Sequence, residues 1–405
     1  MVKISLENAI LKAKAYEKKG EIQEAIKLYR TILQKFPNNK KVQKFLTNMT
    51  KDHPMKQVQV PPADIINQLV TQYNQGQLEY VVERADTLLK QYPKAHVVWN
   101  IFGAALTGLG NNPKAEIAFK QVTKLEPMGA QGFSNLGAAL QRQGKMSAAI
   151  KAYNKALSLK PDYAEAYHNL GVTLNEIGNL REAVKAYNKA LSLKPDYAEA
   201  YNSMGTTLKG LGQFDAAIEA YNKTLELNPN NAAAYNNLGI VLKDQGELKK
   251  SVYAFDRAIS LEPANAIFYK NKGNTLKDQG KLQEAIKNYK TALSIKPDFA
   301  EVWINGAAMF ESWNELCQLK IWLEKAFSAL EFAPSDLCFF KAKLLWRNKE
   351  FLEACELIFD IDFEAITPIR KPDFLNLNAK CLEKLKKFDE AFLCFSRMNA
   401  LMKSS

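Results

Sequence analysis

The sequence predicts an all-α protein, a right-handed α-solenoid built from about ten helix–turn–helix units. One observation is that AYNKALSLKPDYAEAY occurs twice without change, at Ala152–Tyr167 and again at Ala186–Tyr201. The resulting period of about 34 residues is typical of a helix pair that cannot bury its apolar face alone and therefore stacks on a copy of itself. The other observation is that large apolar residues recur at helical spacing within each copy.

Five consecutive units share one pattern when Ala130 is taken as position 1 of the first. The first predicted helix carries apolar residues at positions 4 and 11, Gly at 8 and, except for Lys272, Leu or Met at 7, and the second usually carries Ala at 20 and an aromatic residue at 24. Each set lies on one helix face. The small residues at positions 8 and 20 let the two helices approach closely. A Gly near position 15 ends the first helix, and a Pro at 32 ends the second.

The pattern weakens on both sides of this core. The predicted segments are a first unit at 1–37, a helix and linker at 38–61, a degenerate unit at 62–95, a further unit at 96–129, five regular units at 130–299, a unit whose second helix is shifted by three residues at 300–334, and aberrant units or a cap at 335–405. The linker contains KDHPMKQVQVPP, whose polar and Pro-rich composition predicts a flexible joint.

The repeated positions resemble the tetratricopeptide repeat (TPR) family. In the unit at Ala130 the residues that carry this resemblance are Phe133, Leu136, Gly137, Leu140, Ala149, Tyr153, Ala156 and Pro161. The resemblance implies about ten TPR units. It also implies that the first helix of each unit lines a concave face, where such proteins hold their partners.

No residue pattern points to catalysis. The sequence lacks a phosphate-binding Gly loop of the G-x-x-x-x-G-K type, a G-x-S-x-G nucleophile motif and an H-E-x-x-H zinc motif. Its five cysteines form no C-x-x-C pair, and it has only three histidines. We therefore predict a protein that is not an enzyme and that uses no cofactor and no metal.

The net charge of +12 comes from lysines that mostly alternate with acidic residues along the predicted helices. That arrangement is more typical of a solvated helix surface than of a nucleic-acid interface. There is no apolar run of about 20 residues, as a membrane span would need, and no signal-peptide pattern at the start. We therefore predict a cytoplasmic protein with no nucleic-acid or membrane partner.

The first helices carry a stripe of side-chain amides at repeat positions 5 and 6. The candidate peptide-binding residues on this stripe are Asn67, Asn100, Asn135, His168, Asn169, Asn202, Asn236, Asn237, Asn271 and Asn305. Asn is a mediocre helix former, so a row of it has a cost. Each amide offers an acceptor and donors to a peptide backbone. The alternative is that duplication copied the residues, but Asn67 and Asn305 persist in diverged units.

The expected spacing of this stripe fits an extended peptide. Like helices of neighbouring units should lie about 10 Å apart. An extended chain advances about 3.3 Å per residue, so an amide would meet roughly every third residue of a ligand. Replacing Asn135, Asn169, Asn237 and Asn271 together by Ala is expected to abolish peptide capture without lowering the melting temperature.

Two known binding modes resemble parts of this stripe. The Asn row resembles the superhelical domain of O-linked N-acetylglucosamine transferases, in which Asn residues at the same repeat position hold substrate peptide. Lys270 and Asn274, with Asn305 of the next unit, match half of the carboxylate clamp that binds chaperone C-terminal tails. The other half needs basic residues where Asp336 and Phe340 stand, so we predict that the clamp is incomplete.

The leading functional prediction is a protein-interaction scaffold that binds an extended peptide or partner segment in a concave groove. The alternative is the substrate-recruiting region of a larger enzyme, because the arrangement of units resembles the TPR region of bacterial TPR-containing sulfotransferases. A catalytic domain follows in that family, whereas this sequence ends at NALMKSS, so we expect no sulfotransferase or glycosyltransferase activity. Self-association of the solenoid is a third hypothesis.

Overall fold

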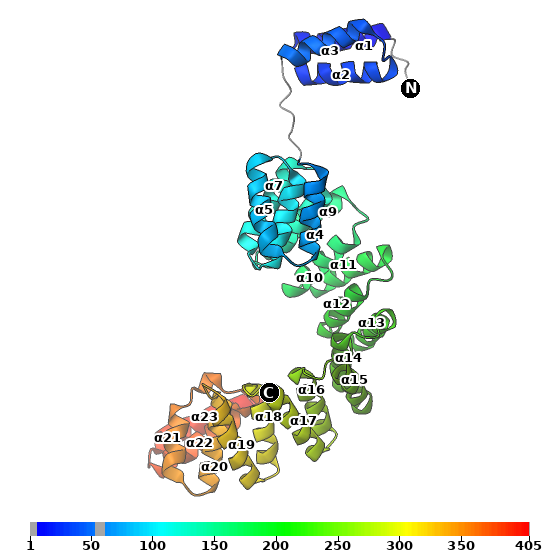
Figure 1. Cartoon of the computed structure of the whole chain (residues 1–405). Helices are drawn as coiled ribbons and strands as arrows, with labels where there is room; N and C mark the ends of the chain where they lie inside the picture. Colours follow the sequence, from blue (N-terminus) through cyan, green and yellow to red (C-terminus); the bar gives the residue numbers. More distant parts are fainter. Residues whose placement is uncertain (1–5, 53–60, 405) are drawn as a thin grey trace. The chain divides into compact units, whose positions relative to one another are not determined.

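The computed structural model describes residues 6–52 and 61–404, and all regular secondary structure in these residues is helical (Figure 1). This confirms the predicted all-α solenoid of stacked helix pairs. The chain divides into two compact units, Met1–Leu159 and Lys160–Ser405. None of the helices in the described ranges is long and apolar enough to cross a membrane.

The first unit contains antiparallel helix pairs and one unpaired helix. Its helices are α1 (Leu6–Lys18), α2 (Ile22–Lys35), α3 (Lys40–Asp52), α4 (Ala63–Asn74), α5 (Leu78–Gln91), α6 (His96–Gly108), α7 (Asn112–Leu125), α8 (Ala130–Gln141) and α9 (Met146–Leu159). The helix predicted before the linker is α3. Most of the predicted flexible linker falls on residues 53–60, which lie outside the described residues.

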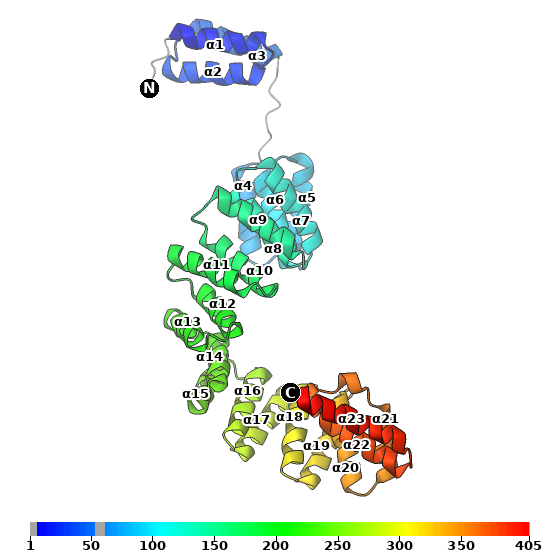
Figure 2. The same cartoon turned by 180° about the vertical axis from the view of Figure 1, so that it is seen from behind.

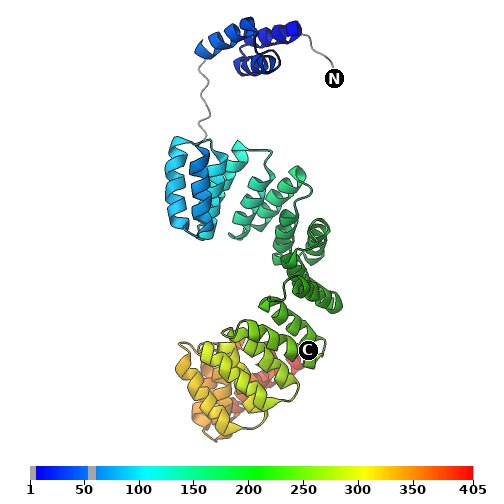
Figure 3. The same ribbon diagram turned by 45° about the vertical axis from the view of Figure 1, so that its right-hand side comes forward.

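The second unit is a continuous stack of helix pairs, coloured green to red in Figure 3. Its α-helices are α10 (Ala164–Glu176), α11 (Leu180–Leu193), α12 (Ala198–Gly210), α13 (Phe214–Leu227), α14 (Ala232–Asp244), α15 (Leu248–Leu261), α16 (Ala266–Asp278), α17 (Leu282–Ile295), α18 (Ala300–Ser312), α19 (Leu316–Ala329), α20 (Ser335–Arg347), α21 (Phe351–Asp360), α22 (Lys371–Lys384) and α23 (Phe388–Ser404). Each first helix packs against its own second helix, and each second helix from α11 to α21 packs against the first helix of the following pair.

A Gly on the first helix and a buried ring on the second hold each regular pair together. A Cβ atom added to Gly205 on α12 would lie 2.8 Å from Cε1 of Tyr221 on α13. Tyr221 is 1% exposed, and its hydroxyl lies 3.1 Å from Oγ1 of Thr206. The ring therefore occupies the space that any other residue at position 8 would need for its side chain.

The turn inside each pair needs a residue in the left-handed conformation. Gly212 provides it after α12, with φ of 72°. The last three pairs lack this Gly, and Asn314, Lys349 and Lys386 adopt the same conformation with φ between 60° and 69°. A residue with a Cβ atom accepts this at a cost of roughly 1–2 kcal/mol. The aberrant C-terminal pairs thus keep the turn geometry although the sequence signal for it is missing.

The predicted shift of three residues in the unit at 300–334 does not occur. Helix α17 begins at Leu282 and helix α19 begins at Leu316, exactly one repeat later, so α19 is in phase. Instead, the Gly and the ring both move by one position. A Cβ atom on Gly306, at position 7, would meet Trp322 at position 23. Because both residues are one position earlier than in the regular units, the close contact between glycine and ring is kept. The sequence pattern did not show this, since neither residue stands at its usual position.

The C-terminal region departs from the repeat after α21, which has only 10 residues. Two 3₁₀ turns, η1 (Phe363–Ala365) and η2 (Pro368–Arg370), connect it to α22, and Figure 2 shows α22 and α23 beside α20 and α21. This connection, residues 361–370, is an insertion that has no counterpart in the regular repeats. Ile366 anchors it, being 1% exposed and packed with Phe339 and Phe374.

Candidate functional site

The candidate site of the second unit is a surface formed by side chains at positions 5 and 6 of its first helices. We call it the amide face and define it by His168, Asn169, Asn202, Ser203, Asn236, Asn237, Asn271 and Asn305. All of these side chains are partly exposed. In the first unit, Asn100 and Asn135 are also partly exposed, and Asn67 on α4 is exposed. The predicted residues are therefore all accessible from solvent.

The amides bind one another from helix to helix. Nδ2 of Asn271 on α16 donates a 2.8 Å hydrogen bond to Oδ1 of Asn236 on α14. Asn237 donates in the same way to Asn202 over 3.4 Å. In the first unit, Asn135 on α8 donates to Asn100 on α6 over 2.9 Å. Each bond joins position 6 of one first helix to position 5 of the preceding one.

This pairing leaves part of each amide available. A side-chain amide has two N–H donors and a carbonyl oxygen with two lone pairs. In the Asn236–Asn271 bond, one donor and one lone pair are used. The bond also stabilises the stack, since a net hydrogen bond contributes about 0.5–1.5 kcal/mol. The structure therefore revises one expectation: replacing these residues by Ala should lower stability as well as binding.

His168 and Ser203 occupy the place of one amide pair. Nε2 of His168 lies 3.2 Å from Oγ of Ser203, and Nδ1 lies 3.2 Å from the hydroxyl of Tyr197, in the loop before α12. The His168 and Tyr197 rings are 5.0 Å apart. Burial lowers the pKa of His168 from 6.5, against smaller opposing effects of an Asn169 hydrogen bond and the Glu199 charge. The imidazole is thus neutral at pH 7 and joins α10 to α12.

This burial predicts a pH-dependent stability. The folded pKa of His168 lies below its unfolded value, so its contribution is complete above about pH 6.5 and is lost as the pH falls below that. A His168→Gln variant should lose this dependence. Urea unfolding of both proteins between pH 7.5 and pH 5 measures the difference, because only the original protein should lose the contribution of His168 as the pH falls. Parallel pH profiles of the two proteins would contradict the assignment.

The residues of the predicted half-clamp are bound to their own chain. Nζ of Lys270 lies 3.0 Å from a carboxylate oxygen of Glu301 on α18. Oδ1 of Asn274 accepts from the Tyr289 hydroxyl over 2.7 Å and from Nδ2 of Asn305 over 3.1 Å. Where the second half of a clamp would stand, Asp336 and Phe340 are only 5% and 3% exposed. Lys270 and Asn274 therefore already join neighbouring helices of the stack.

The sequence alone did not indicate the partners that complete these contacts, namely Tyr197, Ser203, Tyr289 and Glu301. A signal for one of them was present, because an aromatic residue precedes the next first helix at Tyr163, Tyr197 and Phe299. The amide pairs also share a separation of 35 residues, one more than the repeat. That separation becomes meaningful only once neighbouring first helices are known to lie side by side.

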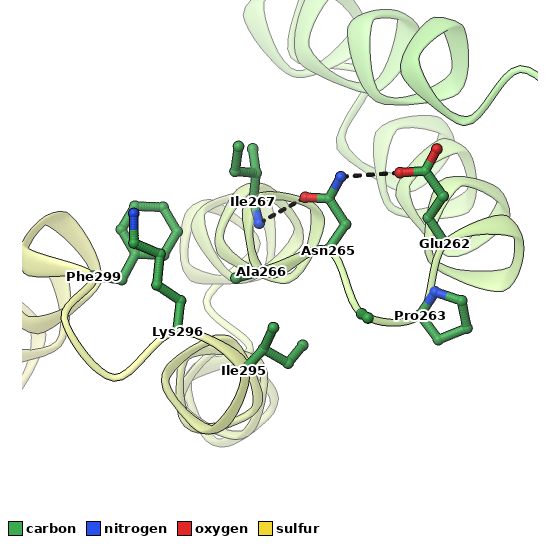
Figure 4. A pocket seen from close by; sticks show the side chains of 9 residues that line it. Glu262, Pro263, Asn265, Ala266, Ile267, Ile295, Lys296 and Phe299 are labelled. Atoms are coloured by element: carbon green, nitrogen blue, oxygen red, sulfur yellow. Dashed lines mark hydrogen bonds between the residues drawn. The ribbon is translucent and has the colours of Figure 1, made fainter. Parts of the chain in front are cut away.

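A surface cavity of about 640 Å³ lies away from the amide face, at the loops before α16 and α18 (Figure 4). Ile267, Ile295 and Phe299 line it together with Glu262 and Asn265. Oδ1 of Asn265 accepts from the backbone N–H of Ile267 over 3.2 Å, and its Nδ2 donates to Glu262 over 3.1 Å. Asn265 thus acts as the cap of α16, so its amide is already used.

Family models cover the regular part of the chain. Models described as tetratricopeptide repeat or TPR repeat match residues 11–39, 130–196, 186–219, 207–246, 232–265, 254–287 and 273–311. No curated protein sequence matches the chain. The resemblance to sulfotransferases and to O-linked N-acetylglucosamine transferases therefore stays a prediction.

Several solved structures are similar to parts of the chain. MamA shares 31% identity with it, over 41% of this chain and 97% of MamA, with a TM-score of 0.39. YrrB, described as a TPR protein with an unusual peptide-binding site, shares 25% identity over 46% of this chain and 95% of YrrB, with a TM-score of 0.40. PilF of Pseudomonas aeruginosa shares 18% identity over 54% of this chain and 96% of PilF, with a TM-score of 0.46. From the family models, residues 11–39 and 130–311 of this chain are tetratricopeptide repeats.

Proposed function

We propose that this chain is a protein-interaction scaffold that binds an extended peptide along the amide face of its second unit. The observation that supports this most directly is the row of partly exposed amides on successive first helices, each with unused donors or lone pairs. Peptide backbone offers matching N–H and C=O groups at every residue. In this proposal the chain acts in the cytoplasm, where it recruits a partner protein and carries out no chemical step itself.

The hydrogen bonds between the amides would lower the entropy cost of binding a peptide. A bond such as Asn271–Asn236 fixes two side chains before a ligand arrives. Ordering a free side chain at an interface costs about 0.5–1.5 kcal/mol, and prior fixation reduces that cost. Because the contacts would be made to backbone, binding should tolerate many ligand sequences. Each hydrogen bond contributes only about 1 kcal/mol net, so we expect modest affinity.

Substituting two amides tests the proposal with a matched control. Asn202→Ala with Asn237→Ala removes one pair from the amide face. Asn188→Ala with Asn222→Ala removes two exposed amides from the second helices α11 and α13. The probe is the tightest binder selected from immobilised random 15-residue peptides. We expect the first variant to bind it about 10-fold more weakly, which corresponds to about 1.4 kcal/mol, and the control to bind unchanged.

The melting temperatures of both variants must be measured alongside affinity, because the Asn202–Asn237 bond also holds α12 to α14. Methylating the backbone nitrogens of the selected peptide should weaken its binding to the unmodified chain. Equal affinity of the two double variants, or binding that ignores backbone methylation, would exclude the amide face as the peptide site.

A further inference from the structure

Most of the net positive charge lies at one end of the chain. The segment 1–60 holds 13 of the 55 lysines and arginines but only five of the 43 acidic residues. Its net charge is therefore +8, against +12 for the whole chain. The rest of the chain is close to balanced, which is why the composition alone suggested an ordinary solvated surface. The described part of this basic segment is the helical module α1–α3.

The module has a core of its own. Ala13 of α1, Ala25 and Tyr29 of α2, and Val42 and Met49 of α3 are all at most 6% exposed and pack together. Figures 1 and 2 both show α1 and α3 on the same side of α2. Their contact is direct, since Nζ of Lys14 on α1 lies 4.7 Å from the centre of the Phe45 ring on α3. Helix α3 therefore stands where the first helix of a next repeat would stand.

The repeat register shows which side chains face outward on α1 and α3. Tyr29, Ala25 and Gly20 correspond to positions 24, 20 and 15 of the regular unit, so α1 begins at position 1. Where the amide face carries Asn, this module carries Ile10, Leu11, Lys44 and Phe45. We define the lysine face by Leu11, Lys14 and Lys18 of α1 together with Lys41, Lys44 and Phe45 of α3.

The lysines of this face have no carboxylate partner among the side chains that the structure describes. All ion pairs found there involve residues from Asp86 onward. Lys18, Lys41 and Lys44 are exposed, and the apolar side chain of Leu11 on α1 is 64% exposed. The face thus combines four positive charges with a protruding apolar residue.

A hydroxyl group beneath this face also has no partner in the described residues. Tyr29 is fully buried, and its hydroxyl makes no hydrogen bond there. In the regular unit the equivalent Tyr289 donates to Asn274 at position 9. Position 9 of the module is Lys14, whose ammonium group cannot accept a hydrogen bond.

We propose that the lysine face binds an acidic protein segment whose carboxylates alternate with apolar side chains. Carboxylates pair with the lysines, and an apolar ligand residue packs on the exposed Leu11. This is a second binding surface, with a ligand chemistry different from that of the amide face, and it does not depend on peptide binding there.

The apolar part of the face argues for this partner over other polyanions. Nucleic acid is bound mainly through phosphate contacts, which Lys and Arg both make, and such contacts would leave the exposed apolar side chain of Leu11 without a role. A membrane-bound helix inserts a broad apolar stripe, whereas Val42 and Met49 of α3 are buried in the module.

The test uses the full chain and a fluorescein-labelled peptide with four Glu-Glu-Leu repeats, followed by fluorescence anisotropy. We expect Lys41→Glu with Lys44→Glu to weaken binding by about 10-fold or more at low salt. The matched control is Lys27→Glu with Lys35→Glu, which changes the charge equally on exposed positions of α2. The control should stay within about twofold of the original affinity, and circular dichroism should show equal helix content for all variants.

Equal losses in the two variants would mean that only total charge matters, and the proposal would be wrong. It would also be wrong if single-stranded RNA, or vesicles containing phosphatidylserine, bound more tightly than the peptide with the same dependence on Lys41 and Lys44. The Asn202→Ala, Asn237→Ala variant should bind the acidic peptide normally. That result distinguishes the two proposals, because peptide binding at the amide face and acidic-peptide binding at the lysine face can each be lost while the other is kept.

Discussion

Replacing Gly205 by Ala should lower the free energy of unfolding of the helices around it by about 1–3 kcal/mol, the usual cost of overpacking a filled core. The new Cβ atom would lie 2.8 Å from Cε1 of Tyr221. The ring cannot move aside cheaply, because it is 1% exposed and its hydroxyl is 3.1 Å from Thr206. A long repeat array need not unfold in one step, so hydrogen exchange of the α12 and α13 amides is the better measurement.

Gly210 on the same helix provides the control. A Cβ atom there would lie 3.3 Å from Cδ1 of Leu180, a flexible side chain that can yield. Ala is a better helix former than Gly by about 1 kcal/mol. Gly210→Ala should therefore leave protection unchanged or increase it. If both variants lowered hydrogen-exchange protection equally, the close contact between position 8 and the aromatic ring would not explain why each repeat has Gly at position 8.

Replacing Arg370 by Ala should destabilise the C-terminal repeats by about 3–5 kcal/mol, because it leaves a buried charge without its partner. Asp336 on α20 is 5% exposed. It accepts from Nη1 of Arg370 over 3.2 Å and from the Thr367 hydroxyl over 2.5 Å, which fixes the η2 turn onto α20. Four of the five Trp residues lie between positions 303 and 346, so Trp fluorescence during urea unfolding reports on this region.

An exposed ion pair in the same region serves as the comparison. Arg397 on α23 lies 3.2 Å from Glu364, and both side chains are more than half exposed. Arg397→Ala should cost at most about 1 kcal/mol. Combining Asp336→Asn with Arg370→Met should recover much of the loss, because no unpaired charge is then buried. Equal effects of Arg370→Ala and Arg397→Ala would show that the Asp336 pair does not hold the insertion in place.

Local patterns predicted the helices well because they depend on residues close in the chain. The repeat period, the Gly at Gly178 or Gly212, and the apolar face of each helix all act within one pair. The positions of the amide row follow from the same register. The pattern is weaker in the unit that contains Gly306 and Trp322, but its second helix still begins one repeat after the previous one. The glycine and the ring that contact each other are both displaced by one position, so they still fit together.

The bonding of the amides could not be predicted in this way, because it depends on how one pair stacks on the next. Asn236 and Asn271 are neighbours only through that stacking, and so are Asp336 and Arg370, whose meeting also depends on the fold of the insertion. Repetition in the chain was sufficient to give the helix pairs and their order. Side-chain orientation between pairs depends on packing across many residues, and that packing determines which polar groups satisfy each other and which stay available for a partner.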